Sequence, residues 1–241
     1  MRSAEALVPL EGRVLALAGA GGSLGPTVVR RLAPTGARLA LAGREAGSLE
    51  ALASELGVDA DVTSVDLLDA AAARAWADGI AERMGRVDGL LHLVGGWRGG
   101  NPIEESPPED WDFLASLLID TLQNVTRAFT PHLLASGRGR FAIVSAAQAQ
   151  APTNTNAAYA AAKAAAEAWT LALAHRFVGT GATANIVVVG SIVSPEMRAE
   201  DPDKDFSTFT PAESIADALA YLCSDAAAPM NGQRLTLRGA V

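Results

Sequence analysis

The sequence predicts an α/β protein of a single domain, residues 1–241, with a doubly wound parallel sheet and helices on both faces. Three observations indicate this fold class. Short apolar runs alternate with longer helical patterns along the chain. These runs are apolar throughout, which is typical of strands covered on both faces. No linker-like change in composition and no internal repeat divides the chain, and 241 residues suffice for one large core.

Seven strands are expected in chain order. They cover Arg13–Ala18, Arg38–Ala42, Asp61–Asp66, Gly89–Val94, Arg140–Val144, Thr183–Val189 and Arg234–Leu237. The helices between them are expected at Pro26–Leu32, Ser48–Leu56, Ala70–Met84, Asp110–Leu134, Ala157–Phe177 and Pro211–Leu222. Pro26 suits the first turn of its helix, where its missing N–H costs nothing. Strict strand–helix alternation predicts parallel strands joined by right-handed crossovers.

One stretch fits neither pattern. Residues 190–210 are too many for a tight connection and carry Pro195, Pro202 and several charged side chains. We interpret this stretch as a segment that covers the substrate. A poorly ordered surface excursion is the alternative.

Charge and composition restrict the partners. The chain has 19 basic and 27 acidic residues, a net charge of −8 and a pI near 4.9. Such a balance argues against nucleic acid, since phosphate binding needs a basic face. No run approaches 18 apolar residues, and the single Cys223 fits a reducing compartment. We therefore expect a cytoplasmic protein with a small-molecule substrate and without a membrane, nucleic-acid or metal partner.

A glycine-rich turn, Ala18-Gly19-Ala20-Gly21-Gly22-Ser23-Leu24-Gly25, separates the first strand from the first helix. In a doubly wound sheet this turn lies at the carboxyl edge, where nucleotides bind. Glycine lets the backbone approach a pyrophosphate, and the helix start supplies free N–H groups and a positive dipole. The residues expected to bind the cofactor here are Gly19, Gly22, Ser23, Leu24 and Gly25. The alternative is a tight turn without a ligand.

Arg44 and Asp66, farther along the chain, are candidates for contacts with the adenosine half of the dinucleotide. Arg44 follows the second strand, where a carboxylate would accept the ribose hydroxyls and repel a 2′-phosphate. Its guanidinium favours NADP(H) over NAD(H), although Arg44 can equally be a solvated residue at a helix start. Asp66 closes the expected third strand and is placed to accept a hydrogen bond from the adenine amine. Its alternative role is a helix cap.

Tyr159 and Lys163 lie four residues apart on a helix and therefore share a face. A cation beside a phenol favours the phenolate and lowers the tyrosine pKa. Such a pair can donate a proton to a substrate while nicotinamide delivers hydride. Glu167, one turn farther on, can simply pair with Lys163 on a solvated face.

Over nearly its whole length the chain resembles the short-chain dehydrogenase/reductase family, which implies a Rossmann-like domain. The residues that carry this resemblance are 87–91, Tyr159 with Lys163, 185–190 and 231–233. It also implies that Gly95 and Gly190 contact the cofactor. Several signature residues differ. The motif's Thr is Ala18, its middle Gly falls on Ser23, Asn-Asn-Ala-Gly is His92-Leu93-Val94-Gly95, the helix Asn is Leu118, the catalytic Ser is Ala146, and the Pro before Gly190 is Val189.

A narrower resemblance is to the dihydropteridine reductases. It rests on Val94–Asn101, on Asp205–Pro211 and on the variant glycine pattern of 18–25. That group likewise keeps Tyr and Lys with Ala in place of Ser, but carries an acidic residue near position 44. Trp97, Ala146 and Gln148 are expected to face the substrate, and Trp97 can stack on a flat ring. For Trp97 the alternative is a hydrophobic plug.

The expected function is NAD(P)H-dependent hydride transfer to a conjugated, electron-poor substrate, with a quinonoid dihydropterin as the first candidate. Loss of the Ser and Asn positions leaves a second reading open, a catalytically silent dinucleotide-binding sensor or assembly subunit. The family pairs its two long helices across a two-fold axis, so a homodimer or homotetramer is expected. His92 is expected to be a buried histidine with satisfied hydrogen bonds.

Overall fold

The computed structural model describes residues 8–238. Its centre is a seven-stranded parallel sheet in the order β3-β2-β1-β4-β5-β6-β9. The strands are β1 (Val14–Ala18), β2 (Arg38–Gly43), β3 (Ala60–Ser64), β4 (Gly89–His92), β5 (Arg140–Ala146), β6 (Thr183–Val189) and β9 (Arg234–Thr236). The strand order reverses between β1 and β4, so a crevice opens beyond their carboxyl ends. The predicted Rossmann-like fold class is confirmed.

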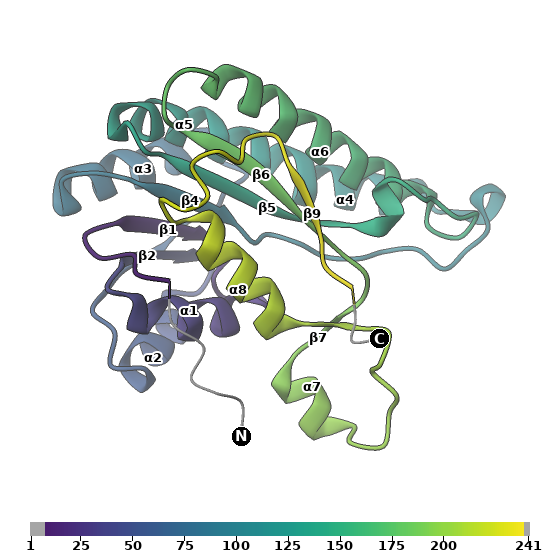
Figure 1. The fold of residues 1–241 in the computed structure, drawn as a ribbon. Helices are drawn as coiled ribbons and strands as arrows, with labels where there is room; N and C mark the ends of the chain where they lie inside the picture. Colours follow the sequence, from purple (N-terminus) through teal and green to yellow (C-terminus); the bar gives the residue numbers. More distant parts are fainter. Residues whose placement is uncertain (1–7, 239–241) are drawn as a thin grey trace.

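Helices cover both faces of the sheet (Figure 1). One layer contains α1 (Gly25–Leu32), α2 (Ala46–Glu55) and α8 (Ala212–Leu222). The other contains α3 (Ala70–Met84), α4 (Pro108–Ala115), α5 (Thr121–Ser136) and α6 (Ala157–Phe177). Side chains along β1 alternate between the layers. Val14, Ala16 and Ala18 join the α3/α5/α6 core, and Leu15 and Leu17 join the α1/α2/α8 core. A strand buried on both faces therefore reads as continuously apolar.

The expected helix over 110–134 is wrong in one respect. It is interrupted by a π-helical turn at Ser116–Asp120, which separates α4 from α5. The wider turn hydrogen-bonds the N–H of Thr121 to the carbonyl of Ser116. Single π turns of this kind occur frequently at functional sites. Apolar periodicity cannot reveal one extra residue in a turn, because the pattern remains helical on either side.

The stretch 190–210 is more regular than expected. It contains β7 (Ile192–Val193), α7 (Pro195–Glu200) and β8 (Thr210–Pro211), and β7 pairs with β8. The side chain of Ser194 accepts a hydrogen bond from the N–H of Met197 at 3.2 Å and so caps α7. These elements lie beyond the carboxyl end of β6 (Figure 1).

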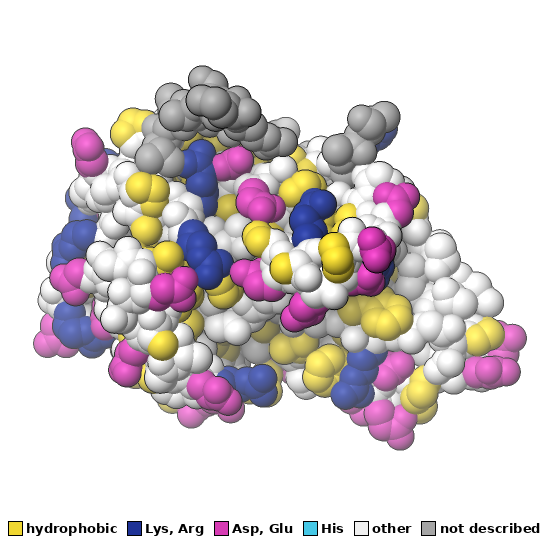
Figure 2. All heavy atoms as spheres, turned by 90° about the horizontal axis from the view of Figure 1, so that it is seen from below, with side chains coloured by type: hydrophobic (Ala, Val, Ile, Leu, Met, Phe, Trp, Pro, Cys, Tyr) yellow, Lys and Arg dark blue, Asp and Glu magenta, His cyan; other side chains and the backbone are white. Residues whose placement is uncertain are grey.

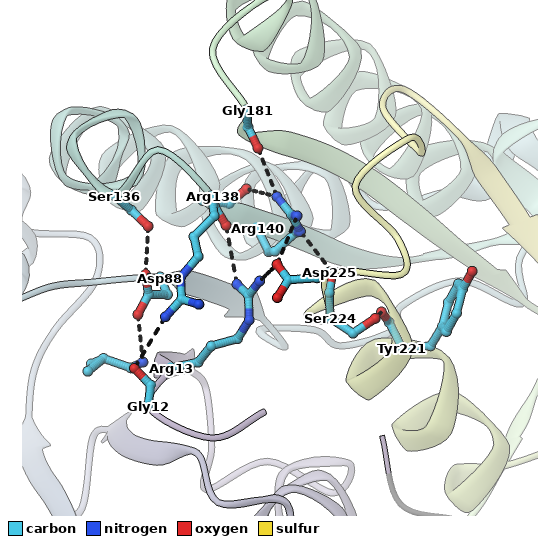
Figure 3. Close-up of polar contacts among 12 residues, drawn as sticks. Gly12, Arg13, Asp88, Ser136, Arg138, Arg140, Gly181, Tyr221, Ser224 and Asp225 are labelled. Carbon is cyan, nitrogen blue, oxygen red and sulfur yellow. Dashed lines mark hydrogen bonds and ion pairs between the residues drawn. The ribbon is translucent and has the colours of Figure 1, made fainter. Parts of the chain in front are cut away.

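Charged side chains join the amino ends of the strands, at the edge opposite the crevice (Figure 3). Asp88 is fully buried and accepts hydrogen bonds from Arg86, Ser136, Arg138 and the N–H of Val14. Beside it, buried Arg13 pairs with Asp225. Buried Arg140 donates to the carbonyls of Gly139, Gly181 and Ser224. Hydrogen bonds of Arg13 and Asp88 thus join the amino ends of β1, β4 and β5.

Residues 8–238 contain neither a candidate membrane span nor a candidate metal site. No helix in this range is long and apolar enough to cross a bilayer. The same residues hold no group of three or more His, Cys, Asp or Glu side chains positioned to bind a metal ion.

Candidate active site

The glycine-rich turn packs closely against its neighbours. Gly19 has φ +81°, and a Cβ there would lie 2.9 Å from the backbone nitrogen of Val94. A Cβ on Gly25 would lie 1.8 Å from the carbonyl oxygen of Ala20, so no larger residue fits. Gly22 and Ser23 are exposed. Leu24, at the N-cap of α1, provides no side-chain cap. The N–H of Gly25 donates to the carbonyl of Gly22, and Pro26 has no N–H. Among residues 8–238, the N–H groups of Ser23, Leu24 and Thr27 have no partner and remain open to a ligand. This combination fits a pyrophosphate.

Arg44 lies beside this turn. It follows the last residue of β2, Gly43, and a Cβ on Gly43 would lie 3.6 Å from the backbone nitrogen of Gly21. Arg44 is exposed, and its carbonyl accepts a hydrogen bond from Ser64 at 2.8 Å. Among residues 8–238 its guanidinium has no carboxylate within ion-pair distance. The geometry thus brings a cation to the edge of the predicted cofactor site.

Asp66 differs from expectation in part. β3 ends at Ser64, so Asp66 does not close a strand but lies in the following turn. Its Oδ1 accepts a hydrogen bond from the N–H of Leu68 at 2.9 Å, while Asp69 is the N-cap of α3. Asp66 is exposed. Its position after the strand next to β2 leaves it at the carboxyl edge of the sheet.

Tyr159 and Lys163 share one face of α6, as their spacing predicts. The Lys163 ammonium donates to the carbonyl of Val144, on β5, at 2.9 Å and lies 5.9 Å from the centroid of the Tyr159 ring. Burial lowers the pKa of Lys163 to about 8, against an opposing effect of Glu167. Burial also raises the pKa of Tyr159, the reverse of the lowering expected from the neighbouring cation. Tyr159 is therefore a phenol, equipped to donate a proton rather than to accept one.

Glu167 does not pair with Lys163 on a solvated face, the simple alternative that their spacing allowed. Glu167 is 2% exposed and pairs with Arg234 of β9, whose Nε lies 2.6 Å from Oε2. Its Oε1 accepts a hydrogen bond from Ser145 at 2.6 Å. Because the Ser145 hydroxyl is held by Glu167, it does not substitute for the hydroxyl missing at Ala146. Ala146 itself is buried at the end of β5.

The loop at 93–103, after β4, is hydrogen-bonded to the loop at 150–156, before α6. The N–H of Gly100 donates to the carbonyl of Thr155 at 2.8 Å, and the N–H of Ile103 to Oδ1 of Asn154 at 3.2 Å. Trp97 lies on the first of these loops and is 60% exposed, which is at odds with a buried plug. Gly95, directly before this loop, is also exposed, as is Gly190 after β6.

Gln148 lies on the short 3₁₀ turn that follows β5. Its Oε1 is buried and has no hydrogen-bond partner within residues 8–238. A buried acceptor without a donor is costly, so this amide oxygen is open to a ligand N–H or O–H.

The segment after β6 forms a hollow of about 350 Å³. Arg198, Lys204, Phe206 and Phe209 are among the residues that line it. The two phenyl rings meet edge to face, and both cations lie within 6 Å of the Phe206 ring centroid.

Figure 2 shows one face of the molecule, on which acidic and basic side chains are interspersed with apolar ones.

Comparison with known proteins gives consistent matches over nearly the whole chain. A family model described as enoyl-(acyl carrier protein) reductase matches residues 19–239. D-threitol dehydrogenase of Mycolicibacterium smegmatis is 30% identical over 243 residues, which covers 95% of this chain and 93% of that protein. Gluconate 5-dehydrogenase of Gluconobacter oxydans is 29% identical, covering 98% and 96%. A short-chain dehydrogenase of Burkholderia cenocepacia, solved with NADP, has a TM-score of 0.82 at 25% identity, covering 96% of this chain and 98% of that one.

Proposed function

The chain belongs to the short-chain dehydrogenase/reductase family of NAD(P)-dependent oxidoreductases, and we propose that within it the protein reduces a conjugated, electron-poor substrate. One observation carries this proposal: Tyr159 and Lys163 are in place on α6, while Ala146 stands where a second hydroxyl would polarise a carbonyl. Removing such a donor typically costs about 10²–10³ in rate where an oxyanion develops. A substrate that is already strongly electrophilic does not depend on it.

Each residue of the candidate site has a separate role in this proposal. The turn at Gly19, Gly22, Ser23, Leu24 and Gly25 would hold the pyrophosphate on the free N–H groups around the start of α1, those of Ser23, Leu24 and Thr27. Asp66, Gly95 and Gly190 would line the rest of the dinucleotide. When bound, the nicotinamide supplies the hydride. Tyr159 keeps its proton because burial raises its pKa, and donates it to the reduced substrate. Lys163 is charged below about pH 8 and orients the neighbouring ribose and Tyr159.

The preferred cofactor is NADP(H). Arg44 offers a guanidinium fork to a 2′-phosphate beside the glycine-rich turn. The related B. cenocepacia structure holds NADP. An acidic residue at this place would favour NAD(H) instead.

The first candidate for the substrate is a quinonoid dihydropterin, and a quinone or another activated C=N or C=O compound would use the same groups. Trp97 is exposed and free to stack on a flat ring. The orphan Oε1 of Gln148 would accept a hydrogen bond from such a ring. The segment 190–210, which forms the hollow lined by Phe206 and Phe209, would cover the substrate.

The second candidate is a dinucleotide-binding protein without catalysis, favoured by Ala146 and Leu118 at two signature positions. The variant Tyr159→Phe separates the two. If Tyr159 is the acid, its loss should lower kcat by about 10²–10⁴ and leave NADPH binding within twofold. Steady-state reduction of quinonoid dihydropterin and of 1,2-naphthoquinone measures the rate, and calorimetry measures binding. Unchanged turnover contradicts the assigned acid, and binding without turnover by the native protein favours the silent alternative.

A homodimer or homotetramer is also proposed. Trp111 and Phe113 on α4 are 43% and 38% exposed, which supports pairing through this layer of helices. Light scattering that shows a monomer would exclude it.

A further inference from the structure

His92 ends β4 in the interior of the site and is 4% exposed. Its Nε2 lies 3.4 Å from Oγ1 of Thr121. The Thr121 hydroxyl already donates its proton to the carbonyl of Leu117 at 2.7 Å. Because a hydroxyl has only one proton to give, Oγ1 can only accept from His92. The proton of the neutral imidazole is therefore on Nε2.

This tautomer leaves Nδ1 as a hydrogen-bond acceptor. Within residues 8–238, Nδ1 is buried and has no partner. The expectation of a fully satisfied buried histidine is thus wrong. Burial, together with the charge of Lys163, lowers the pKa of His92 to about 3, so the ring does not resolve the missing bond by taking up a proton at neutral pH.

A small hollow adjoins the ring. His92 and Lys163 both line it, and the other lining residues are apolar: Val94, Leu118, Leu122, Ile143, Val144 and Ala166. Its free volume is about 10 Å³, close to what one water molecule needs. Lys163 is the one residue of this lining whose side chain is a strong donor besides His92 itself. The ammonium has three N–H groups, and one is used on the carbonyl of Val144.

We propose that Nδ1 of His92 accepts a hydrogen bond from Lys163 through one water molecule in this hollow, which makes His92 a positioning residue for Lys163. Two directions of the ammonium are then fixed, one on β5 and one on β4. The third is left for the cofactor ribose. The π turn at Ser116–Asp120 takes part, since its Leu118 closes the hollow and Thr121 directly after it sets the tautomer.

The role in catalysis rests on the proposed function, whereas the hydrogen bond itself does not. The test of the bond is a ¹⁵N–¹H correlation spectrum of the imidazole rings, which distinguishes the tautomers and shows whether the unprotonated nitrogen is hydrogen-bonded. The chain has three histidines, so His132 and His175 serve as internal references. His92 should show a proton on Nε2 and an Nδ1 signal displaced in the direction of hydrogen bonding.

In Lys163→Met the Nδ1 signal of His92 should move toward that of a free acceptor, while the signals of His132 and His175 stay in place and report an intact fold. The exposed Lys204→Met is the matched control and should move none of them. A proton on Nδ1 in the native protein, a native Nδ1 signal typical of a free acceptor, or an Nδ1 signal that is the same in Lys163→Met overturns the proposal. None of these outcomes requires turnover, so a protein without reductase activity still decides the question.

Kinetics supply the second readout. His92→Leu removes the acceptor and should lower kcat by about 10- to 100-fold, the usual range for a hydrogen bond to a charged group, with the KM for NADPH within twofold. His92→Asn offers an amide oxygen and should restore much of the loss. Equal kcat values in His92→Leu and the native enzyme, or a loss in His92→Asn as large as in His92→Leu, contradict positioning through this acceptor.

Discussion

At the scale of single residues, burial shifts the pKa values of the two proposed catalytic side chains in opposite directions. Burial raises the pKa of Tyr159 and lowers that of Lys163 to about 8. The phenol therefore keeps its proton at neutral pH, whereas the ammonium is close to losing its own. We therefore expect the loss of activity at alkaline pH to follow the deprotonation of Lys163.

This assignment predicts the pH dependence. Lys163 loses its charge as the pH rises through about 8, so kcat/KM for NADPH, which reports ionisations of the free enzyme, should fall above that value. In Lys163→Arg the guanidinium stays charged, so this variant should be slower but should not show the fall in kcat/KM above pH 8. Initial rates from pH 6 to 10 measure both profiles. A native profile that is flat to pH 9.5 contradicts the assignment.

At this scale, contacts between residues that are close in sequence could be predicted, and contacts between distant residues could not. Tyr159 and Lys163 lie within one turn of a helix, so their spacing was enough. Glu167 pairs with Arg234, 67 residues away, and His92 shares its hollow with Lys163 from another element. Such partners are set by the order of the strands. Only the residue types, a carboxylate and a histidine among apolar neighbours, marked these two positions.

At the scale of elements, the strands and helices of the core follow from apolar periodicity. The ranges of α3, α6 and β6 agree with expectation, because Asp69 and Gly85 bound α3, α6 is a long Ala-rich run, and β6 is apolar over most of its length. The helix over 110–134 did not, since a π turn leaves no trace in apolar periodicity. The elements between 190 and 211 are too short to show an apolar period. The one sequence signal that could have indicated α7 is Ser194, a residue type that favours the N-cap.

The start of α1 gives a prediction at this scale. Gly25→Ala places a methyl group 1.8 Å from the carbonyl oxygen of Ala20, so the turn must shift. Overpacking of this kind costs about 1–3 kcal/mol of unfolding free energy, and NADPH binding should weaken with it. Gly47→Ala, in α2 with nothing within 4 Å of the new methyl group, is the control and should stabilise by about 0.5–1 kcal/mol. Urea denaturation measures both. Equal stability of the two variants contradicts the packing described for the turn.

At the scale of the whole molecule, the two edges of the sheet have different tasks. The carboxyl edge carries the candidate site, and the amino edge is joined by hydrogen bonds and ion pairs around the buried Asp88 (Figure 3). Burial by itself would raise the pKa of Asp88, but hydrogen bonds from Ser136, Arg86 and the N–H of Val14 outweigh it and lower the pKa below its ordinary value. A buried carboxylate that binds its proton less readily in the folded state stabilises the fold when it is charged.

The sign of this effect predicts acid sensitivity. The contribution of Asp88 is fully present above the pKa of the unfolded state, about 3.9, and is lost as the pH falls through the lower folded pKa. Asp88→Asn should cost about 1–3 kcal/mol at pH 7, because it removes the buried charge to which Arg86, Arg138 and Ser136 donate, while the two partly exposed guanidinium groups can still be solvated. Urea denaturation between pH 2.5 and 7 should show the native and variant curves converging below about pH 4. A constant difference across this range would exclude the linkage.

The most direct test of the central claim, a dinucleotide-dependent reductase with a phosphate-recognising Arg44, is calorimetric titration of the protein with NADPH and with NADH. We expect NADPH to bind at least about tenfold more tightly, the value of one charge-assisted contact to the 2′-phosphate. Arg44→Asp should reverse the preference and leave the melting temperature of the free protein unchanged. Equal affinities in the native protein contradict the role of Arg44, and binding of neither cofactor contradicts the account of the site.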